Sequence, residues 1–333
     1  MDALRQYPLL AVIPLLLMAI AAAEGWWRLR QGLGYDWKAY WASLGDALGR
    51  GLLGRVLQGG VVAAVLYAVQ TVRVAEIGMD RWWHWGLLFL GQEFSYYWMH
   101  RADHRIRWFW LSHAVHHSPN QYTLAAAYRL GWTSQITAAG VFFAPLVWLG
   151  FPVPVVLATL ALNLFYQFWL HTELIGRLPA WFEYLFNAPA HHRVHHASNP
   201  EYLDCNYGGV LIVFDRLFGT FRKEKPDVPI RYGLTEPLTT YNPVRIALHA
   251  WVKLVADLRV ARGWRERWRM VVGPPGGHAR ADGERVTAAT DYRGCSPMAD
   301  PVPVPSGLRV TCLPAQLPEV SAAGGAGGNT SCM

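Results

Sequence analysis

The stretch FNAPAHHRVHHASNP, residues 186–200, places four histidines within six positions: His191, His192, His195 and His196. Side chains three or four residues apart share one face of a helix, so His192, His195 and His196 are expected to point toward a common centre. Buried imidazoles at this density repel one another when protonated and lack partners when neutral, unless a cation organises them. The stretch therefore predicts one wall of a metal site.

Two earlier stretches have the same kind of spacing. HRADH carries His100 and His104, and HAVHH carries His113, His116 and His117. With the HRVHH histidines they provide eight imidazoles, which is more than a single tetrahedral zinc ion can use. We therefore expect two metal ions of higher coordination number, held by three separate parts of the chain.

The composition of the 333 residues is unusual for a water-soluble domain, because 53% are hydrophobic and only 16% are charged. Apolar runs long enough to cross, or nearly cross, a bilayer occupy residues 7–25, 56–75, 82–99, 132–150 and 152–170. The first run could instead be a signal peptide, because AIAAAEG resembles a cleavage site. The pattern predicts an all-α integral membrane bundle with four to five spans.

The net charge of +7 is explained better by membrane topology than by nucleic-acid binding, because the basic residues lie between apolar runs and form no nucleic-acid motif. They concentrate in residues 26–55 and after His100, whereas the loop between holds Arg73 and Arg81. This alternation places the segments after the first, third and fifth runs in the cytoplasm. The histidine motifs would then form a cytoplasmic helical cap on a protein of the inner membrane.

The composition divides the chain into four parts. Residues 1–81 hold the first spans and a basic loop, and residues 82–222 hold the histidine motifs. Residues 223–272 include NPVRIALHAWVKLVADLRVARGWRERWRM, a basic amphipathic helical segment suited to an anionic membrane surface or to packing on its own domain. Residues 273–333 are rich in Gly, Pro, Ala and Ser without periodicity, so we expect disorder.

The identity of the metal is inferred separately from its ligands. Imidazole suits zinc, copper, nickel and iron alike, so the spacing does not exclude zinc. A site at the membrane boundary favours a redox metal, because attack on the unactivated C–H bonds of a lipid chain requires oxygen activation, and a pair of irons fits best. A membrane metal transporter is an alternative of another class, but it would need ligands near the bilayer midplane rather than at span ends.

The motifs, their order and their relation to the apolar runs resemble the fatty acid hydroxylase and sterol desaturase superfamily of membrane-bound non-haem di-iron oxygenases. The resemblance covers about residues 82–222 and extends to the flanking text, EFSYYWMHRADH at the first motif and NYGGVLIVFDRLFGTF after the last. Within the superfamily, YQFWLHTELIG and NAPAHHRVHH look most similar to the alkylglycerol monooxygenase and bacterial sterol-desaturase-like branch.

The resemblance implies one further metal ligand near the end of the last span, where this chain has His171. Some members supply another histidine one turn later, but this chain has Ile175 there. The departure leaves a tenth ligand open. His191 is the candidate to replace it, either as a ligand or through a hydrogen bond to one.

Carboxylates are expected near the metals, because neutral ligands leave the positive charge of two cations uncompensated and imidazole N–H groups need acceptors. Those inside or beside the motifs are Glu93, Asp103, Glu173, Asp204 and Asp215. We favour Glu93, Glu173 and Asp215 for orienting imidazoles. Asn206 is a further candidate, and ordinary surface charges or helix caps are the alternative.

The resemblance implies an iron-dependent oxidoreductase that hydroxylates a C–H bond of a membrane lipid with O2. Desaturation is the alternative, because it shares the first hydrogen removal; the lipids implied are sterols, sphingolipid-type acyl chains and glycerol ethers. The sequence has no haem segment, flavin fingerprint or ferredoxin cysteine pattern. Electrons are therefore expected from a separate partner, a ferredoxin or cytochrome with its reductase.

Overall fold

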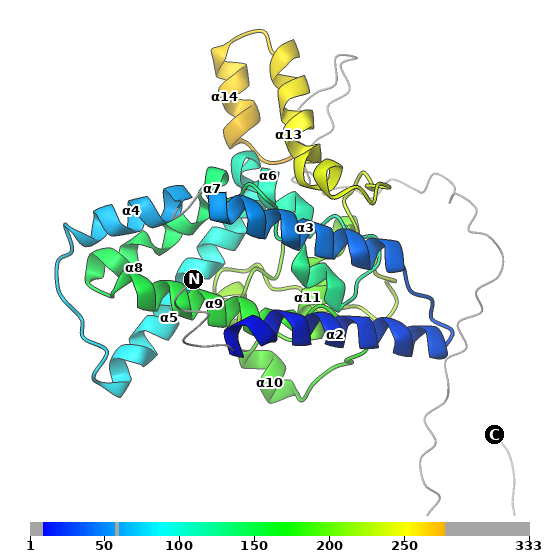
Figure 1. Ribbon diagram of the computed structural model, residues 1–333, viewed down its shortest axis with the longest axis horizontal. Coiled ribbons are helices and arrows are strands. Elements are labelled where there is room, and N and C mark those ends of the chain that lie inside the picture. The colour runs from blue at the N-terminus through cyan, green and yellow to red at the C-terminus, as the bar shows by residue number, and fades with distance from the viewer. Residues whose placement is uncertain (1–8, 57–59, 277–333) are drawn as a thin grey trace, which may run out of the picture. The chain divides into compact units, whose positions relative to one another are not determined.

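The computed structural model describes residues 9–56 and 60–276 (Figure 1). In these residues the regular structure is helical, and two isolated antiparallel bridges, Phe186 to Leu211 and Ala197 to Tyr232, stand in place of a sheet. The predicted all-α fold is confirmed for the described part of the chain. Most of the predicted disordered tail, from residue 277 onward, lies outside that part.

The helices, with short 3-10 helices marked η, follow one another in this order: α2 (Leu9–Arg30), α3 (Trp37–Val56), α4 (Gly60–Gln70), α5 (Trp82–Arg105), α6 (Arg107–His116), η1 (Leu124–Tyr128), α7 (Ser134–Thr137), η2 (Ala139–Phe143), α8 (Ala144–Leu149), α9 (Val153–Phe168), α10 (Ala180–Leu185), α11 (Pro189–His195), η3 (Pro200–Tyr202), α12 (Val213–Leu217), α13 (Pro243–Val260) and α14 (Trp264–Val272).

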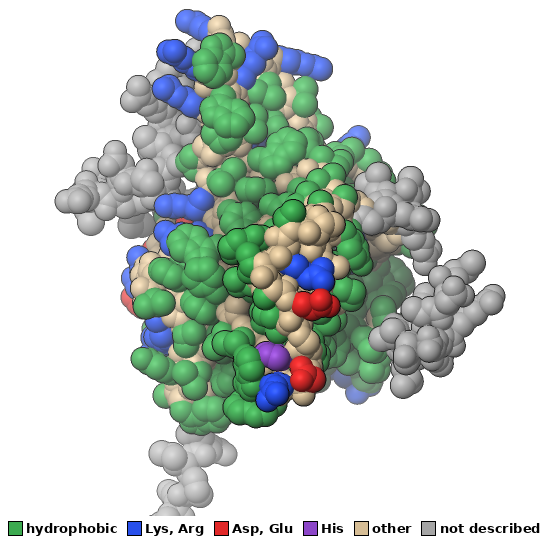
Figure 2. Space-filling model, turned by 90° about the vertical axis from the view of Figure 1, so that its left-hand side faces the viewer, with side chains coloured by type: hydrophobic (Ala, Val, Ile, Leu, Met, Phe, Trp, Pro, Cys, Tyr) green, Lys and Arg blue, Asp and Glu red, His purple; other side chains and the backbone are tan. Residues whose placement is uncertain are grey.

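The most apolar part of the protein consists of α4, α5, α8 and α9. These helices and η2 pack around a buried cluster that includes Leu66, Leu88, Phe143, Val147 and Val156. Figure 2 shows hydrophobic side chains over most of the face on the side of α4 and α8. Exposed apolar surface of this extent fits a lipid environment better than water.

One helix is long and apolar enough to cross a membrane by length and composition, at Val12–Arg30 within α2. Shorter apolar helices cover Gly60–Gln70, Ala139–Leu149 and Val153–Phe168. The 11 residues of α4 make a helix about 17 Å long, which is less than the roughly 30 Å of a bilayer core. The structure is therefore that of a helical protein with apolar helices suited to a membrane, most of them shorter than a full span.

The prediction of one continuous span over residues 132–150 was wrong. This segment is divided into α7, η2 and α8, and the division falls at Ala138, which has a left-handed backbone (φ 58°). Ala139–Leu149 is apolar, as predicted, but it is shorter than a span. The break was not visible because alanine is normally a good helix former.

The N-terminal helices are tied to the rest of the fold by a buried carboxylate. Ala21 of α2 and Tyr40 of α3 pack against Leu124 of η1. Glu24 of α2 accepts hydrogen bonds from the backbone amide of Leu124 (2.6 Å) and from the hydroxyl of Thr172 (2.5 Å). Thus α2 is joined to the segment that follows α9.

Residues 243–272 form two helices rather than one amphipathic segment. The inner face of α13 is buried, and its Ala250 and Leu254 pack with Leu111 of α6. An extended backbone at Gly263 (φ −177°) separates α13 from α14. Packing on the protein's own domain therefore accounts for one face of α13.

Residues 223–242 are not helical, and they are not separate from the histidine-bearing region. Val228 and Ile230 pack against a buried cluster that contains Val194 of α11 and Tyr202 of η3. These residues therefore contribute to the packing around α11.

A substitution at Gly150 tests the turn between α8 and α9. Its φ is 122°, and an added Cβ would lie 2.5 Å from the backbone carbonyl oxygen of Ala75. We expect Gly150→Ala to lower the free energy of unfolding by about 2 kcal/mol. The control Gly86→Ala, where a Cβ meets nothing within 4 Å, should change it by less than about 1 kcal/mol. Thermal melting in detergent measures both, and equal melting temperatures would contradict this account.

Candidate metal centre

The first two histidine motifs lie at the ends of two packed helices. His100 and His104 lie one turn apart near the C-terminus of α5, which ends before an extended residue, Ile106 (φ −124°, ψ 116°). His113 and His116 are in the last turn of α6, and His117 is its C-cap. The break at Ile106 lets α6 pack beside α5, so both helices present their histidines to one region.

The third motif is carried by α11. This helix begins at Pro189, a position that proline favours because the first amide of a helix has no partner inside it. It carries His192 and His195, with His196 at its C-cap. His171 follows the C-terminus of α9.

These imidazoles form two groups: His100, His104, His113, His117 and His195 in the first, and His116, His171, His192 and His196 in the second. Within each group the candidate ligand atoms all lie within 4.8 Å of one another. The groups adjoin, because the rings of His117 and His196 stack with centroids 4.4 Å apart. The structure thus brings together the eight motif histidines and His171.

Backbone carbonyl groups determine which ring nitrogen faces inward. Four Nδ1 atoms lie within hydrogen-bond distance of a carbonyl oxygen: His100 with Tyr207 (2.8 Å), His116 with Arg129 (2.9 Å), His171 with Gln167 (2.8 Å) and His195 with Cys205 (2.9 Å). A carbonyl oxygen only accepts, so each Nδ1 must carry the proton and each Nε2 keeps a lone pair. These four imidazoles are therefore in the tautomer that binds a metal through Nε2.

The inward nitrogens are too close together to be explained by hydrogen bonding. Nε2 of His171 lies 3.2 Å from Nε2 of His116, and both atoms present lone pairs. Nε2 of His113 lies 3.1 Å from the Nε2 atoms of three neighbours, His100, His104 and His117, but could donate to only one of them. Two nitrogens at right angles around a metal with bonds of about 2.1 Å are about 3 Å apart. The donor set therefore fits cations placed between the rings.

Burial keeps these imidazoles neutral. It lowers the pKa of eight of them below the ordinary value of 6.5, namely His100, His113, His116, His117, His171, His192, His195 and His196. For His116 the pKa falls to about 4. Neutral imidazole is the form that binds a metal ion, so the electrostatics agree with the geometry.

His191 lies outside both groups of ligand atoms. Its ring contacts Phe221, with centroids 5.2 Å apart, and its backbone oxygen accepts a hydrogen bond from the Asn206 amide (3.0 Å). We therefore leave it out of the proposed ligand set. The neighbouring positions of His191 and His192 in the sequence correspond to different faces of α11.

Asp215 acts on the centre through the backbone. Its carboxylate accepts hydrogen bonds from the amides of Tyr207 (2.8 Å) and Gly208 (2.7 Å) and from the hydroxyl of Thr220 (2.7 Å). Tyr207 provides the carbonyl oxygen that accepts from His100. Asp215 thus helps to orient the His100 imidazole indirectly, by fixing the backbone of Tyr207. Burial raises the pKa of the Asp215 carboxyl group to about 6.

Glu93 has a similar bracing role rather than a contact with an imidazole. Its carboxylate accepts hydrogen bonds from the amides of Val210 and Leu211 (both 2.8 Å) and from the side chain of Asn163. Glu93 and Asp215 therefore hold the same loop from two sides.

The other two predicted orienting residues contact neither group directly. The Asn206 side chain donates to the carbonyl oxygen of His191 and accepts from the amide of Arg222 (2.7 Å), so it fixes the backbone beside α11. Glu173 pairs with Arg28 of α2 (3.2 Å). Its hydrogen bonding therefore ties α2 to the segment after His171.

Two carboxylates that sequence reasoning had not favoured lie closer to the histidines. An Asp204 oxygen is 3.6 Å from Nδ1 of His104, and an Asp103 oxygen is 3.9 Å from Nδ1 of His113. Their positions inside or beside motifs were the available signal. The four carbonyl acceptors had no such signal, because every residue has a carbonyl group.

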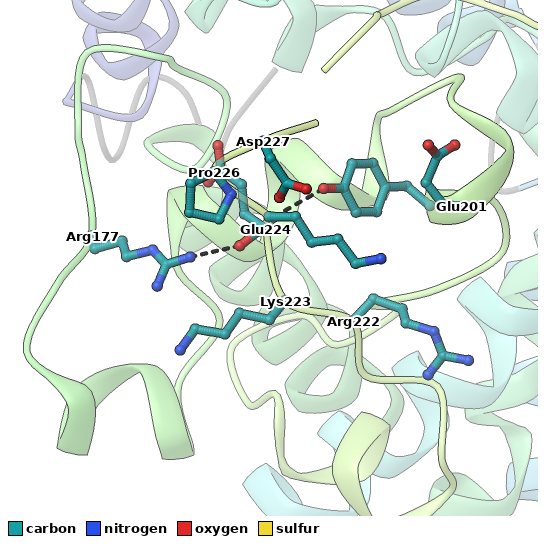
Figure 3. Close-up of a pocket in the computed structure, with 9 residues that line it drawn as sticks. Arg177, Glu201, Arg222, Lys223, Glu224, Pro226 and Asp227 are labelled. Carbon is teal, nitrogen blue, oxygen red and sulfur yellow. Dashed lines mark hydrogen bonds between the residues drawn. The ribbon is translucent and has the colours of Figure 1, made fainter. Parts of the chain in front are cut away.

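A separate surface pocket of about 450 Å³ lies near α11 (Figure 3). Its charged lining residues are Arg177, Arg222, Lys223, Lys225, Glu201, Glu224 and Asp227. Arg177 donates to the carbonyl oxygen of Glu224 (2.6 Å), and the Glu224 side chain pairs with Arg193 of α11 (2.9 Å). The lining contains none of the grouped histidines, so this pocket is distinct from the candidate metal centre.

Residues 85–220 match the family model of the fatty acid hydroxylases. This region contains both histidine groups. The resemblance inferred from the motifs is confirmed. No solved structure matches the chain.

The chain is similar to alkylglycerol monooxygenases. It is 35% identical to the one from Xenopus tropicalis over 251 residues, which cover 73% of this chain and 55% of the relative. It is 37% identical to the one from Homo sapiens over 215 residues, covering 65% and 47% respectively. An ornithine lipid hydroxylase of Rhizobium tropici is 29% identical over 143 residues, 43% of each chain. The chain spans about half the length of these relatives.

The metal-free protein should lose stability as the pH falls. The pKa of His116 drops from 6.5 to about 4 on folding, so below pH 6.5 the unfolded state binds protons that the folded state does not. The stabilisation is complete above 6.5 and is lost as the pH falls toward about 4. Denaturant unfolding of chelator-treated protein across this range measures the effect. An unchanged or rising midpoint on acidification would contradict it.

Separate replacement of His171 and His191 tests which of the two histidines binds metal. We expect His171→Ala to remove about one metal ion per chain, because it removes one of the four nitrogens in the second group. His191→Ala, the matched control on α11, should retain both ions. Metal analysis of the purified variants measures the number of ions per chain. Equal loss of metal from the two variants would show that His191 belongs to the ligand set as much as His171 does.

Proposed function

We propose that this chain is a membrane-bound non-haem di-iron oxygenase that hydroxylates a C–H bond of a lipid with O2 and external electrons. The observation that carries the proposal is the pair of adjoining histidine groups, in which neighbouring Nε2 atoms lie 3.1 to 3.2 Å apart, about the separation of two nitrogens bound to one metal ion. The match of residues 85–220 to the fatty acid hydroxylase model supports the same reaction class.

In this proposal each group holds one iron. The first would be bound by His100, His104, His113, His117 and His195, and the second by His116, His171, His192 and His196. Iron bound there would supply the activation of O2 that an unreactive C–H bond requires. Nine neutral nitrogens and no thiolate suit iron, although imidazole alone also accepts zinc.

The protein's own groups orient the ligands and exclude water. The carbonyl oxygens of Tyr207, Arg129 and Gln167 hold Nδ1 protons, so the ring orientations do not depend on solvent. A metal-bound imidazole has no free lone pair, so we assign no general base among these histidines. Most of the nine side chains are less than 8% exposed, which limits access of bulk water to the centre.

A lipid substrate is supported by the apolar surface and by the relatives. Leu87 of α5 and Leu162 and Phe165 of α9 are each more than half exposed, so the helices leading to the cap would lie among lipid chains. The similar proteins are an alkylglycerol monooxygenase and an ornithine lipid hydroxylase by name. Hydroxylation is therefore favoured, and desaturation at the same site is the second candidate because both begin with removal of one hydrogen.

The proposed reaction requires an electron donor, and the charge pattern indicates where the protein lies in the cell. Electrons would come from a separate ferredoxin or cytochrome with its reductase. The distribution of basic residues favours an inner-membrane protein with its histidine cap in the cytoplasm. The substrate would then enter sideways from the inner leaflet.

Anaerobic purification followed by metal analysis and Mössbauer spectroscopy tests the metal centre. We expect close to two coupled irons per chain, because two ligand groups adjoin. Stoichiometric zinc without iron, in protein made under iron-replete conditions, would refute the oxygenase and favour a metal-handling role such as transport.

Lipid profiling of cells with and without the protein tests the reaction. We expect a lipid with one added oxygen, and loss of two hydrogens would instead identify a desaturase. Cells with His192→Ala should lack the product, because this residue belongs to the second group. Cells with His249→Ala, a histidine of α13 outside both groups, should make it normally. Product formation by His192→Ala would count against the assigned site.

A further inference from the structure

The helical hairpin α13–α14 carries a strong positive charge that the proposed reaction does not use. Residues 243–272 contain seven basic and two acidic side chains, a net charge of +5. One of the two acids, Asp257, is paired with Arg107 of α6. Lys253 is paired with Glu236 (2.8 Å). The other six basic residues are arginines with exposed side chains, and their charge faces the surroundings.

The base of the hairpin contacts the chain at α6, which follows the apolar run 82–99, and at the first residues of the apolar segment 132–150. The amide of Arg107, just after α5, donates to the Gly273 carbonyl oxygen (2.9 Å) at the end of α14. The Trp251 indole of α13 donates to the hydroxyl of Thr133 (3.0 Å), at the start of the run 132–150. These contacts hold the hairpin at the predicted cytoplasmic boundary of the membrane.

The exposed surface of the hairpin combines apolar and basic groups. Val252 and Val260 are 67% and 70% exposed, and Trp264 and Trp268 are 73% and 61% exposed. The Arg265 guanidinium lies 5.5 Å from the centre of the Trp264 ring. Exposed tryptophan beside arginine is typical of surfaces that sit at the level of lipid headgroups.

A shallow groove between the two helices has the same mixed chemistry. Val255, Leu258, Arg259 and Arg267 line its volume of about 470 Å³. The aliphatic side chains can contact an acyl or glycerol portion, while the two guanidinium groups suit the two free oxygens of a phosphodiester. Zwitterionic lipids share this phosphate but carry a compensating cation, so the net charge favours an anionic headgroup.

We propose that the α13–α14 hairpin is a docking surface for anionic phospholipid at the cytoplasmic face of the membrane, with the Arg259–Arg267 groove binding the headgroup phosphate. An acidic protein could also be attracted by the charge, but it would not account for the exposed tryptophans and valines beside the arginines. The inference does not depend on the chemistry at the metal centre.

Hydrogen–deuterium exchange of the full chain in lipid nanodiscs tests the proposal. The bilayers compared are phosphatidylcholine alone and an equal mixture of phosphatidylcholine and phosphatidylglycerol. We expect amide exchange in α14 to be about tenfold slower in the mixture, and high salt should reverse the difference. Equal exchange in the two bilayers would overturn the proposal and leave an acidic protein as the partner to test.

Two double variants distinguish binding in the groove from attraction by the overall positive charge of the hairpin. Arg259→Ala with Arg267→Ala should abolish the lipid-dependent slowing, whereas Arg262→Ala with Arg269→Ala removes the same charge from the hairpin and should keep most of it. Unchanged exchange in α6, which supports the hairpin, shows that each variant is folded. Equal loss in the two double variants would overturn the headgroup site in the groove.

Discussion

The hydrogen bond from a histidine Nδ1 to a backbone carbonyl oxygen is the interaction on which the candidate centre depends. It occurs at His100, His116, His171 and His195, and in each case it leaves the Nε2 lone pair directed into a group of imidazoles. Without a cation these lone pairs would oppose one another in a buried space, where solvent cannot screen the repulsion. The arrangement is therefore understandable as a preorganised donor set, and the position of each carbonyl becomes part of the site.

The surrounding structure serves to position those carbonyls. Glu93 and Asp215 accept hydrogen bonds from the loop that includes Tyr207, and both carboxylates are buried. Arg129, whose carbonyl oxygen accepts from His116, is held through its side chain by Ser43 of α3 and by Ser118 (both 3.0 Å). Glu24 of α2 binds Thr172, the residue after His171. The N-terminal helices thus support the ligands from outside, although they supply none.

Much of this could be predicted from local pattern. The histidine spacing identified all nine grouped residues with the help of the family resemblance at His171, because positions three and four apart share a helix face. The apolar runs predicted the helical class. The interruption at Ala138 and the break between α13 and α14 could not be predicted, because backbone conformation there depends on packing against other helices. Glu93 and Glu173 were predicted to orient imidazoles, but the partners found for them are the backbone of a loop and the side chain of Arg28, respectively.

By itself, the sequence indicated the candidate donors, the apolar character of the helices and the resemblance to the fatty acid hydroxylases, since each depends on residue type and spacing along the chain. The tertiary structure decided which histidines share a group, that His191 lies outside both groups, and which carbonyl oxygens orient four of the rings. Those outcomes depend on distances between segments far apart in the chain. His192 and His171 show the reason: 21 residues apart, their Nε2 atoms come within 3.0 Å only when α11 packs against the end of α9.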